Sequence, residues 1–161
     1  MAAKPKKELQ ITITASKAAA KKYTNWQDYN KLLQASAFEV LNSELPGFTE
    51  VKLTIVLYTD DELLELNRRL LGHDFYTDIL TCELEREGAL LEAELYFSLD
   101  RASENALRYK VTLRNELARL AIHGILHLAG HEDSDIKAKN QMRQKERFFL
   151  RRLQTERSIE Y

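Results

Sequence analysis

Apolar residues recur along the chain at two spacings, and these predict nine secondary-structure elements. Short apolar runs, most of them alternating with polar residues, predict strands over 9–14, 51–58, 77–84 and 91–99. Spacings of three and four predict helices over 26–43, 113–129 and 135–155, and two shorter helices that begin near residues 60 and 100. The order β-α-β-α-β-β-α-α-α predicts an α/β fold: a single-domain sandwich in which helices cover a mixed four-stranded sheet.

Side chains that favour helix ends set the expected limits of the helices. Asn25 is expected to cap the helix over 26–43, which Pro46-Gly47 would end. Asn67 lies on the apolar stripe of the next helix, where its amide must find hydrogen-bond partners. The caps expected for the other helices are Asp60 or Asp61, Asp100, Thr112, and Ser134 or Asp135.

The helix over 113–129 is apolar around most of its circumference, which predicts a central core helix. Its polar residues fall on one narrow line, which should therefore border a cleft. Gly124 interrupts this helix at a cost of about 1 kcal/mol relative to alanine. Close packing of another backbone, or of a substrate, would explain that glycine. The polar line consists of Glu116, Arg119, His123 and His127, and the main apolar stripe of Leu117, Leu120, Ala121, Ile125 and Leu128.

Length and composition favour one globular domain. The 161 residues are 44% hydrophobic and 30% charged, and we expect a flexible basic N-terminus over 1–8 and a single domain over 9–157. No apolar stretch is long enough to cross a membrane, and the lysine-rich first 22 residues do not resemble a secretory signal. The one cysteine, Cys82, can have no internal disulfide partner, which favours a cytoplasmic protein.

The net charge of −1 hides an uneven distribution. Lysines are concentrated near the N-terminus, lysines and arginines in the last helix, and glutamates between residues 83 and 94. A nucleic-acid partner requires a local positive surface more than a positive total charge, so it stays possible. Taken singly, most of these charges are better explained by solvated helix faces and a flexible basic tail.

His123 and His127 are four residues apart, which places both imidazoles on one face of the helix. Such a pair can hold one metal ion if a third ligand returns from beyond the helix end. Gly130 ends the helix, and His131, Glu132 and Asp133 follow as candidates for that ligand. Two core histidines satisfied by backbone or carboxylate groups are the alternative. The metalloprotease pattern H-E-x-x-H does not apply, because glycine stands where that motif has its general base.

The run H-G-I-L-H-L-A-G over 123–130, followed by a short acidic turn, resembles the signature H-G-x-L-H-L-x-G-Y-D-H of the YbeY family of bacterial endoribonucleases. Residues 66–74 and the run T-D-I-L-T over 77–81 are similar to that family's asparagine-bearing helix and T-D-V-L-S strand. Residues 95–105 and the last helix also fit. The resemblance therefore covers about residues 50–150.

This resemblance implies a metal-dependent, single-strand-specific endoribonuclease, a hydrolase of RNA phosphodiester bonds. It further implies a role in small-subunit rRNA 3′-end processing and ribosome quality control, with single-stranded rRNA and the ribosomal small subunit as partners. The family's metal, taken to be Zn²⁺, sits on three histidines. Two of these fall on His123 and His127, and the third falls on Asp133. A carboxylate is a competent zinc ligand, and it widens the choice of divalent metal. His131 is the alternative third ligand, which Gly130 disfavours by breaking the helix.

The resemblance also suggests residues for catalysis and RNA binding. His123 and Glu132 are the catalytic candidates, with Glu132 as a general base, an orienting group or a plain exposed turn residue. Family members carry an arginine where this chain has Leu71, so Arg68, Arg69 or His73 could supply the charge. Ala93-Glu94 stand where a glycine-aspartate pair is usual.

Two further side chains have open roles at this stage. Arg119 could contact phosphate or form a salt bridge to Glu116, three residues away. Asp78 could orient a metal-ligating histidine or cap the strand that follows it.

Three functions are compatible with this sequence. The first is the metal-dependent endoribonuclease. The second is a non-catalytic RNA-binding ribosome-assembly factor with a structural metal, which Leu71 and Asp133 would favour. The third is a metal-dependent hydrolase of another substrate.

Overall fold

Four strands form one mixed sheet in the order β1-β2-β4-β3. In the computed structural model, which describes residues 6–155, β1 (Glu8–Ala15), β2 (Glu50–Tyr58) and β4 (Leu90–Ser98) run parallel. β3 (Ile79–Glu87) pairs antiparallel with β4. Leu91, Ala93, Leu95 and Phe97 of β4 are all buried, as their alternation predicts.

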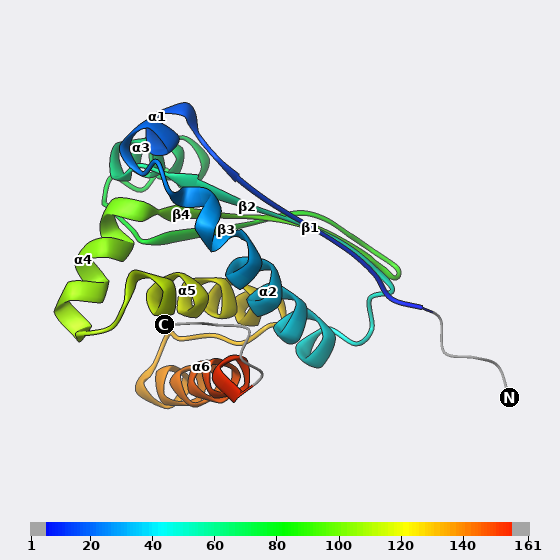
Figure 1. Cartoon of the computed structure of the whole chain (residues 1–161). Coiled ribbons are helices and arrows are strands. Elements are labelled where there is room, and N and C mark those ends of the chain that lie inside the picture. The colour runs from blue at the N-terminus through cyan, green and yellow to red at the C-terminus, as the bar shows by residue number, and fades with distance from the viewer. Residues whose placement is uncertain (1–5, 156–161) are drawn as a thin grey trace, which may run out of the picture.

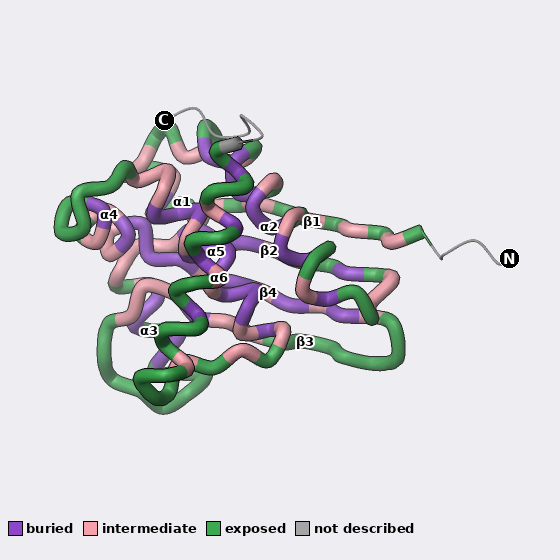
Figure 2. Tube along the Cα trace, turned by 90° about the horizontal axis from the view of Figure 1, so that it is seen from below, coloured by how far each residue is buried: buried purple, intermediate pink, exposed green. Residues whose placement is uncertain are grey.

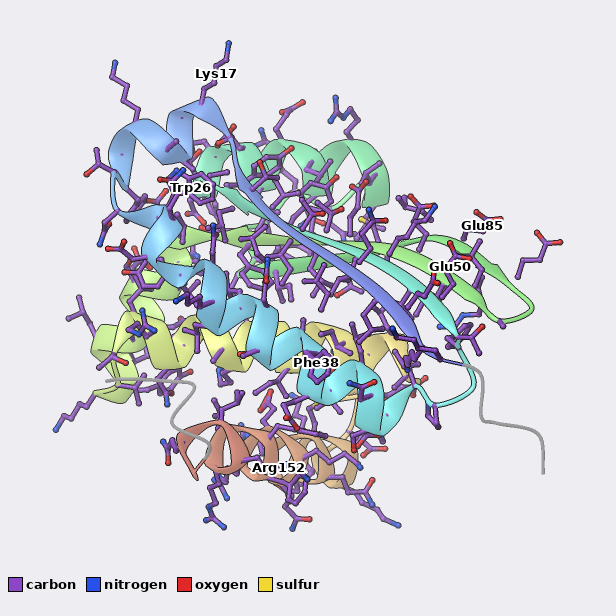
Figure 3. All side chains as sticks on the ribbon, turned by 45° about the vertical axis from the view of Figure 1, so that its right-hand side comes forward. Lys17, Trp26, Phe38, Glu50, Glu85 and Arg152 are labelled. Atoms are coloured by element: carbon purple, nitrogen blue, oxygen red, sulfur yellow. The ribbon has the colours of Figure 1, made fainter. Side chains whose placement is uncertain are left out.

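Helices cover both faces of the sheet, and one helix forms an additional layer (Figure 1). α1 and α3 lie on one face, whereas α2 and α5 lie on the other, with α6 beyond them. Side chains fill the space between these layers (Figure 3). The predicted α/β sandwich with a mixed four-stranded sheet is therefore confirmed. The helices are α1 (Lys17–Lys22), α2 (Asn30–Glu44), α3 (Asp60–Leu71), α4 (Leu99–Tyr109), α5 (Leu113–Leu128) and α6 (Ile136–Thr155).

α5 is the central helix that its apolar surface predicts. Leu117, Leu120, Ala121 and Ile125 are completely buried, and Leu128 nearly so. Figure 2 shows that buried residues gather along the inner strands and this helix, while exposed residues dominate the outer side of the molecule. α5 therefore lies between the sheet and α6 (Figure 1), and His123 on its polar side contacts α6 through Glu146.

Gly124 brings α5 close to the sheet, and the neighbouring atoms are side chains rather than the backbone or substrate that the sequence suggested. A Cβ atom at this position would lie 2.8 Å from Cδ1 of Ile79 and 3.0 Å from Cδ2 of Leu95. Both contacts are shorter than van der Waals separation, so an added methyl group must displace packed core atoms.

We expect Gly124→Ala to destabilise the protein by about 1 kcal/mol, although alanine is the better helix former. Overpacking costs about 1–3 kcal/mol, and the middle of that range exceeds the gain of about 1 kcal/mol in helix propensity. Urea unfolding measures the difference, with Gly124→Val as a second variant that should lose more stability. A stabilised Gly124→Ala protein would show that α5 can move away from the sheet freely.

Several predicted element limits are wrong, and local hydrogen bonds give the reasons. Residues 26–29 form a 3₁₀ turn before α2, and Asn25 makes no capping bond with its side chain. The cap of α3 is Thr59, paired with Glu62 in a capping box, rather than an aspartate. Ser98 caps α4 in place of Asp100, which instead accepts hydrogen bonds from the side chains of Lys22 and Tyr23 and from the backbone N–H of Asp60. Thr112 caps α5 as predicted. The short helix α1 was not predicted.

Lys7, which precedes the predicted strand, contacts the end of α2. The Lys7 ammonium donates to the carbonyl oxygens of Leu41 and Leu45 at the end of α2, at 2.8 and 2.6 Å, and β1 starts at Glu8. Residues 1–5 of the expected basic N-terminus and residues 156–157 of the expected domain lie outside the described residues. Within 6–155, every helix is too short or too polar to cross a membrane.

Candidate metal centre and adjoining groove

His123 and His127 lie side by side on one face of α5, as their spacing predicts. Their rings meet edge to face with centroids 4.5 Å apart, and their Nε2 atoms are 3.0 Å apart. Both side chains are half-buried at the surface of an otherwise buried helix. The two Nε2 atoms therefore point to one common position.

Asp133 returns to this position from the turn after α5. The turn depends on Gly130, whose φ of 95° lies in the left-handed region that glycine tolerates best. The backbone N–H of His131 donates to the carbonyl of Leu126 at 3.0 Å, which closes the turn. Oδ2 of Asp133 consequently lies 3.6 Å from Nε2 of His123 and 3.6 Å from Nε2 of His127.

These three atoms form a cluster whose dimensions suit a metal ion. All of them lie within 4.8 Å of one another. In a tetrahedral zinc site with bonds of about 2.0–2.1 Å, two ligand atoms are about 3.3 Å apart. The separations of 3.0 and 3.6 Å bracket that value, so shifts of a few tenths of an ångström would complete the site. Two imidazoles and a carboxylate leave a fourth position for water or substrate, and the Asp133 side chain is 44% exposed on that open side.

Glu146 of α6 holds the first histidine in place. Its Oε1 atom lies 2.8 Å from Nδ1 of His123, and an ionised carboxylate there accepts a hydrogen bond from the Nδ1–H group. With Nδ1 protonated, the neutral ring keeps the lone pair of Nε2 free for a metal. Sequence reasoning missed Glu146, although its position carried a signal. Glu146 lies on the buried stripe of α6 with Met142, Phe149 and Leu153, and an acid on such a stripe requires a partner.

Arg119 forms the salt bridge to Glu116, which is one of the two roles expected for it from the sequence. Its guanidinium makes two bonds to Glu116, of 2.6 and 3.0 Å, and further contacts to Glu146 at 3.3 Å and Asp78 at 3.7 Å. Burial disfavours the arginine's charge, but the bonds and charges of these carboxylates outweigh burial and raise its pKa. Asp78 also accepts a bond from Asn105 at 3.1 Å, so it supports Arg119 rather than a histidine.

The other two candidates in the turn after α5 lie away from the histidine pair. Nε2 of His131 is 3.0 Å from Oε2 of Glu44 on α2, and Lys145 bonds to the second oxygen of the same carboxylate. These two hydrogen bonds outweigh the effect of burial and lower the pKa of Glu44. Glu132 is exposed. It lines a hollow together with His131, whereas His123 and Asp133 line a different hollow.

The cationic candidates at the end of α3 are engaged in local contacts. Arg68 forms ion pairs with Asp74 and Glu65, and His73 stacks on Phe75 at 5.0 Å between ring centroids. Arg69 is exposed at the last turn of the helix, next to Leu71, whose side chain is also exposed.

Asn67 supports the turn that follows α3. Its side chain is buried, and Nδ2 donates a hydrogen bond of 2.9 Å to the Phe75 carbonyl, which holds this turn. The expectation for the amide is met only in part, because Oδ1 has no partner among the described residues.

The polar line of α5 borders a groove, as expected. A hollow of about 200 Å³ lies beside the metal cluster and is lined by His123, Asp133 and Lys139, among others. A second hollow of about 590 Å³ continues toward α4 and is lined by Asn105, Tyr109 and Arg147, among others. Both hollows share Arg119, Arg143 and Glu146, so they adjoin along α6.

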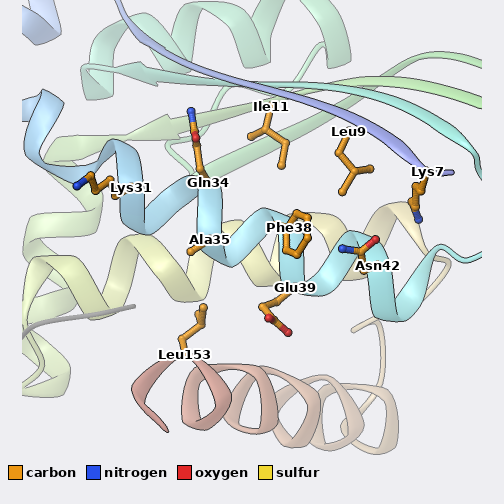
Figure 4. Close-up of a pocket in the computed structure, with 10 residues that line it drawn as sticks. All are labelled: Lys7, Leu9, Ile11, Lys31, Gln34, Ala35, Phe38, Glu39, Asn42 and Leu153. Carbon is orange, nitrogen blue, oxygen red and sulfur yellow. The ribbon is translucent and has the colours of Figure 1, made fainter. Parts of the chain in front are cut away.

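A separate groove of about 750 Å³ lies between β1 and α2 (Figure 4). Its walls include Leu9, Ile11 and Phe38, and Glu39 is the one acidic residue among 6–155 that lines it. The lining residues within that range include neither histidine nor a group of carboxylates, so they lack the ligands that the expected chemistry requires.

Comparisons with known proteins identify relatives over nearly the whole described chain. The sequence model of the family described as Endoribonuclease YbeY matches residues 6–154. A protein of Chlorobium phaeobacteroides named Endoribonuclease YbeY is 39% identical over 127 residues, which cover 78% of this chain and 89% of that protein. A protein of the same name from Chlorobium limicola is 36% identical and covers 77% of this chain and 84% of its own length. The solution structure of TM1509 from Thermotoga maritima superposes with a TM-score of 0.60 at 28% identity, covering 91% of both chains.

Proposed function

The chain belongs to the YbeY endoribonuclease family, and we propose that it cleaves single-stranded RNA with the help of one divalent metal ion. The observation that carries this proposal is the convergence of His123, His127 and Asp133 on one position at the end of a groove. Zn²⁺ is the ion that two imidazoles and a carboxylate with an open fourth position favour. Bound there, it would lower the pKa of a coordinated water toward ~7 and polarise a phosphoryl oxygen.

The residues around the cluster would prepare it for this chemistry. Glu146 fixes the ring of His123 with Nε2 facing the ligand position. Arg119 in turn holds Glu146 and Glu116, so the support of His123 extends through α5 and α6. Glu132 is proposed as a general base that approaches from the exposed turn. Arg68, Arg69 and His73 are proposed RNA contacts at the end of α3.

The resemblance to YbeY proteins also guides the proposed substrate. We propose that the RNA is rRNA, with the small-subunit 3′ end as the processed site, and that the protein acts in the cytoplasm in rRNA maturation and ribosome quality control. The second candidate function is a non-catalytic assembly factor with a structural metal. It is considered because this chain has Leu71 at a position where YbeY proteins are expected to have an arginine.

Metal-replete wild-type protein, incubated with single-stranded and duplex RNA, tests the proposal. We expect cleavage of the single strand, and its loss in His127→Ala, whose side chain is at the surface and whose removal should leave the fold intact by circular dichroism. Lys31→Ala on α2 is the control, because it removes a surface charge in the separate groove. Stoichiometric metal without cleavage would contradict the nuclease and favour the assembly factor.

A further inference from the structure

We infer that α6 binds the RNA backbone through Lys139, Arg143 and Arg147, named here the α6 cationic row, and that Tyr109 stacks on a base at the far end of the groove. This inference rests on the proposed function, since it concerns the strand whose cleavage the metal cluster would catalyse. It assigns the binding of phosphates to a helix that lies across the groove from the histidines.

The α6 cationic row follows the groove from one end to the other. Lys139 lines the hollow that contains His123 and Asp133, Arg143 lines both hollows, and Arg147 lines the hollow toward α4. The three residues are four positions apart, so they lie on one helix face with about 6 Å of rise between neighbours. Their long side chains can adjust to successive phosphates of an extended single strand.

The charges of the row are uncompensated, unlike those of Lys145 and Arg152 on the same helix. Within residues 6–155, the side chains of Lys139, Arg143 and Arg147 make no ion pair, and all three are exposed. Lys145 and Arg152 of the same helix are bound by Glu44 and Glu39 on α2. The α6 cationic row is thus available to bind phosphate groups in the groove.

The floor of the groove cannot perform this role. It carries the carboxylates of Asp78, Glu116 and Glu146, all of which contact the single guanidinium of Arg119. An arginine shared among three carboxylates has no charge to spare for phosphate, and the floor is negative overall. The strand is therefore expected to follow the rim formed by α6 rather than the floor.

Tyr109 supplies an aromatic face where the groove reaches α4. Its side chain is 59% exposed at the end of the helix, beside Val111 and Leu150 in the groove wall. An exposed aromatic ring beside a row of cations is the combination that single-strand-binding proteins use, because every base offers a face for stacking.

Binding of a fluorescent single-stranded RNA of about ten nucleotides, measured by anisotropy at several salt concentrations, tests the row separately from cleavage. We expect the triple variant Lys139→Ala/Arg143→Ala/Arg147→Ala to bind roughly 10- to 100-fold more weakly and to lower the salt-dependence slope by about 2. The matched control is Lys17→Ala/Lys21→Ala/Lys31→Ala, which removes the same charge from α1 and α2. Figure 3 places Lys17 across the sheet from α6.

Tyr109 has its own matched set of variants. Tyr109→Ala should weaken binding roughly 5- to 100-fold, whereas Tyr109→Phe should keep most of it, since stacking needs the ring and not the hydroxyl. Leu107→Ala is the control, because Leu107 is exposed on the same helix but does not line the groove.

The outcomes separate this inference from the proposed function. Equal binding by the two triple variants would overturn the α6 cationic row, even if the wild-type protein cleaves RNA. Binding that depends on the row, without cleavage by metal-replete wild-type protein, would support the row and contradict the nuclease. Wild-type protein that binds no single-stranded RNA would overturn the row directly.

Discussion

Asp133→Ala is expected to lose metal binding and RNA cleavage, while His131→Ala keeps both. Oδ2 of Asp133 lies 3.6 Å from each histidine nitrogen, whereas the His131 ring is bonded to Glu44 and faces α2. Removal of an outer hydrogen-bonding partner costs roughly 10–100-fold in metal affinity, and loss of a direct ligand should exceed this. We expect cleavage to fall on the order of 10³-fold, equivalent to about 4 kcal/mol.

Metal stoichiometry by atomic absorption, a competition titration with a chromophoric chelator, and the rate of RNA cleavage measure these effects together. Asp133→His provides a conservative rescue, because imidazole also binds zinc and a histidine at this position restores the pattern that the sequence resembles. Retained metal in Asp133→Ala combined with loss in His131→Ala would reverse the assignment of the third ligand.

The sequence predicts the metal cluster because its three members are close in the chain. Helical spacing places His123 and His127 together, and Gly130 turns Asp133 back toward them, so local geometry alone defines most of the site. The central position of α5 is equally predictable, because its apolar residues cover most of the helix surface.

The groove and the support of His123 depend instead on how distant elements pack. Glu146 reaches His123 only because α6 docks against α5, which no local spacing specifies. The rotation of α6 about its axis decides which of its cations pair with α2, as Lys145 and Arg152 do, and which form the α6 cationic row. The sequence alone does not distinguish these two groups of cations. Thr59 and Ser98 were missed for a different, local reason. Each stands one or two residues before an aspartate that is an equally good cap former, and residue type alone does not choose between such neighbours.

Arg119→Ala is expected to destabilise the protein more than any surface substitution, by about 3–5 kcal/mol. The Glu116 side chain is 1% exposed, and its two oxygens are bound by the guanidinium at 2.6 and 3.0 Å. Without Arg119, a single bond of 3.3 Å from Asn105 remains to hold the charge of that carboxylate among the described residues. A buried carboxylate that loses its partner has been removed from water without compensation.

A double-mutant cycle distinguishes this origin from a simple loss of packing. Arg119→Met and Glu116→Leu should each cost several kcal/mol in urea unfolding, because each leaves a buried charge without its main partner. The pair Glu116→Leu/Arg119→Met should recover part of that loss, since two apolar side chains of similar size replace both charges. The recovery is partial because Glu146 and Asp78 also lose their contacts with Arg119. Arg108→Ala, on the exposed side of α4, is the control and should change stability by no more than about 0.5 kcal/mol. Additive losses in the double variant would show that Arg119 and Glu116 stabilise the protein independently and not through their ion pair.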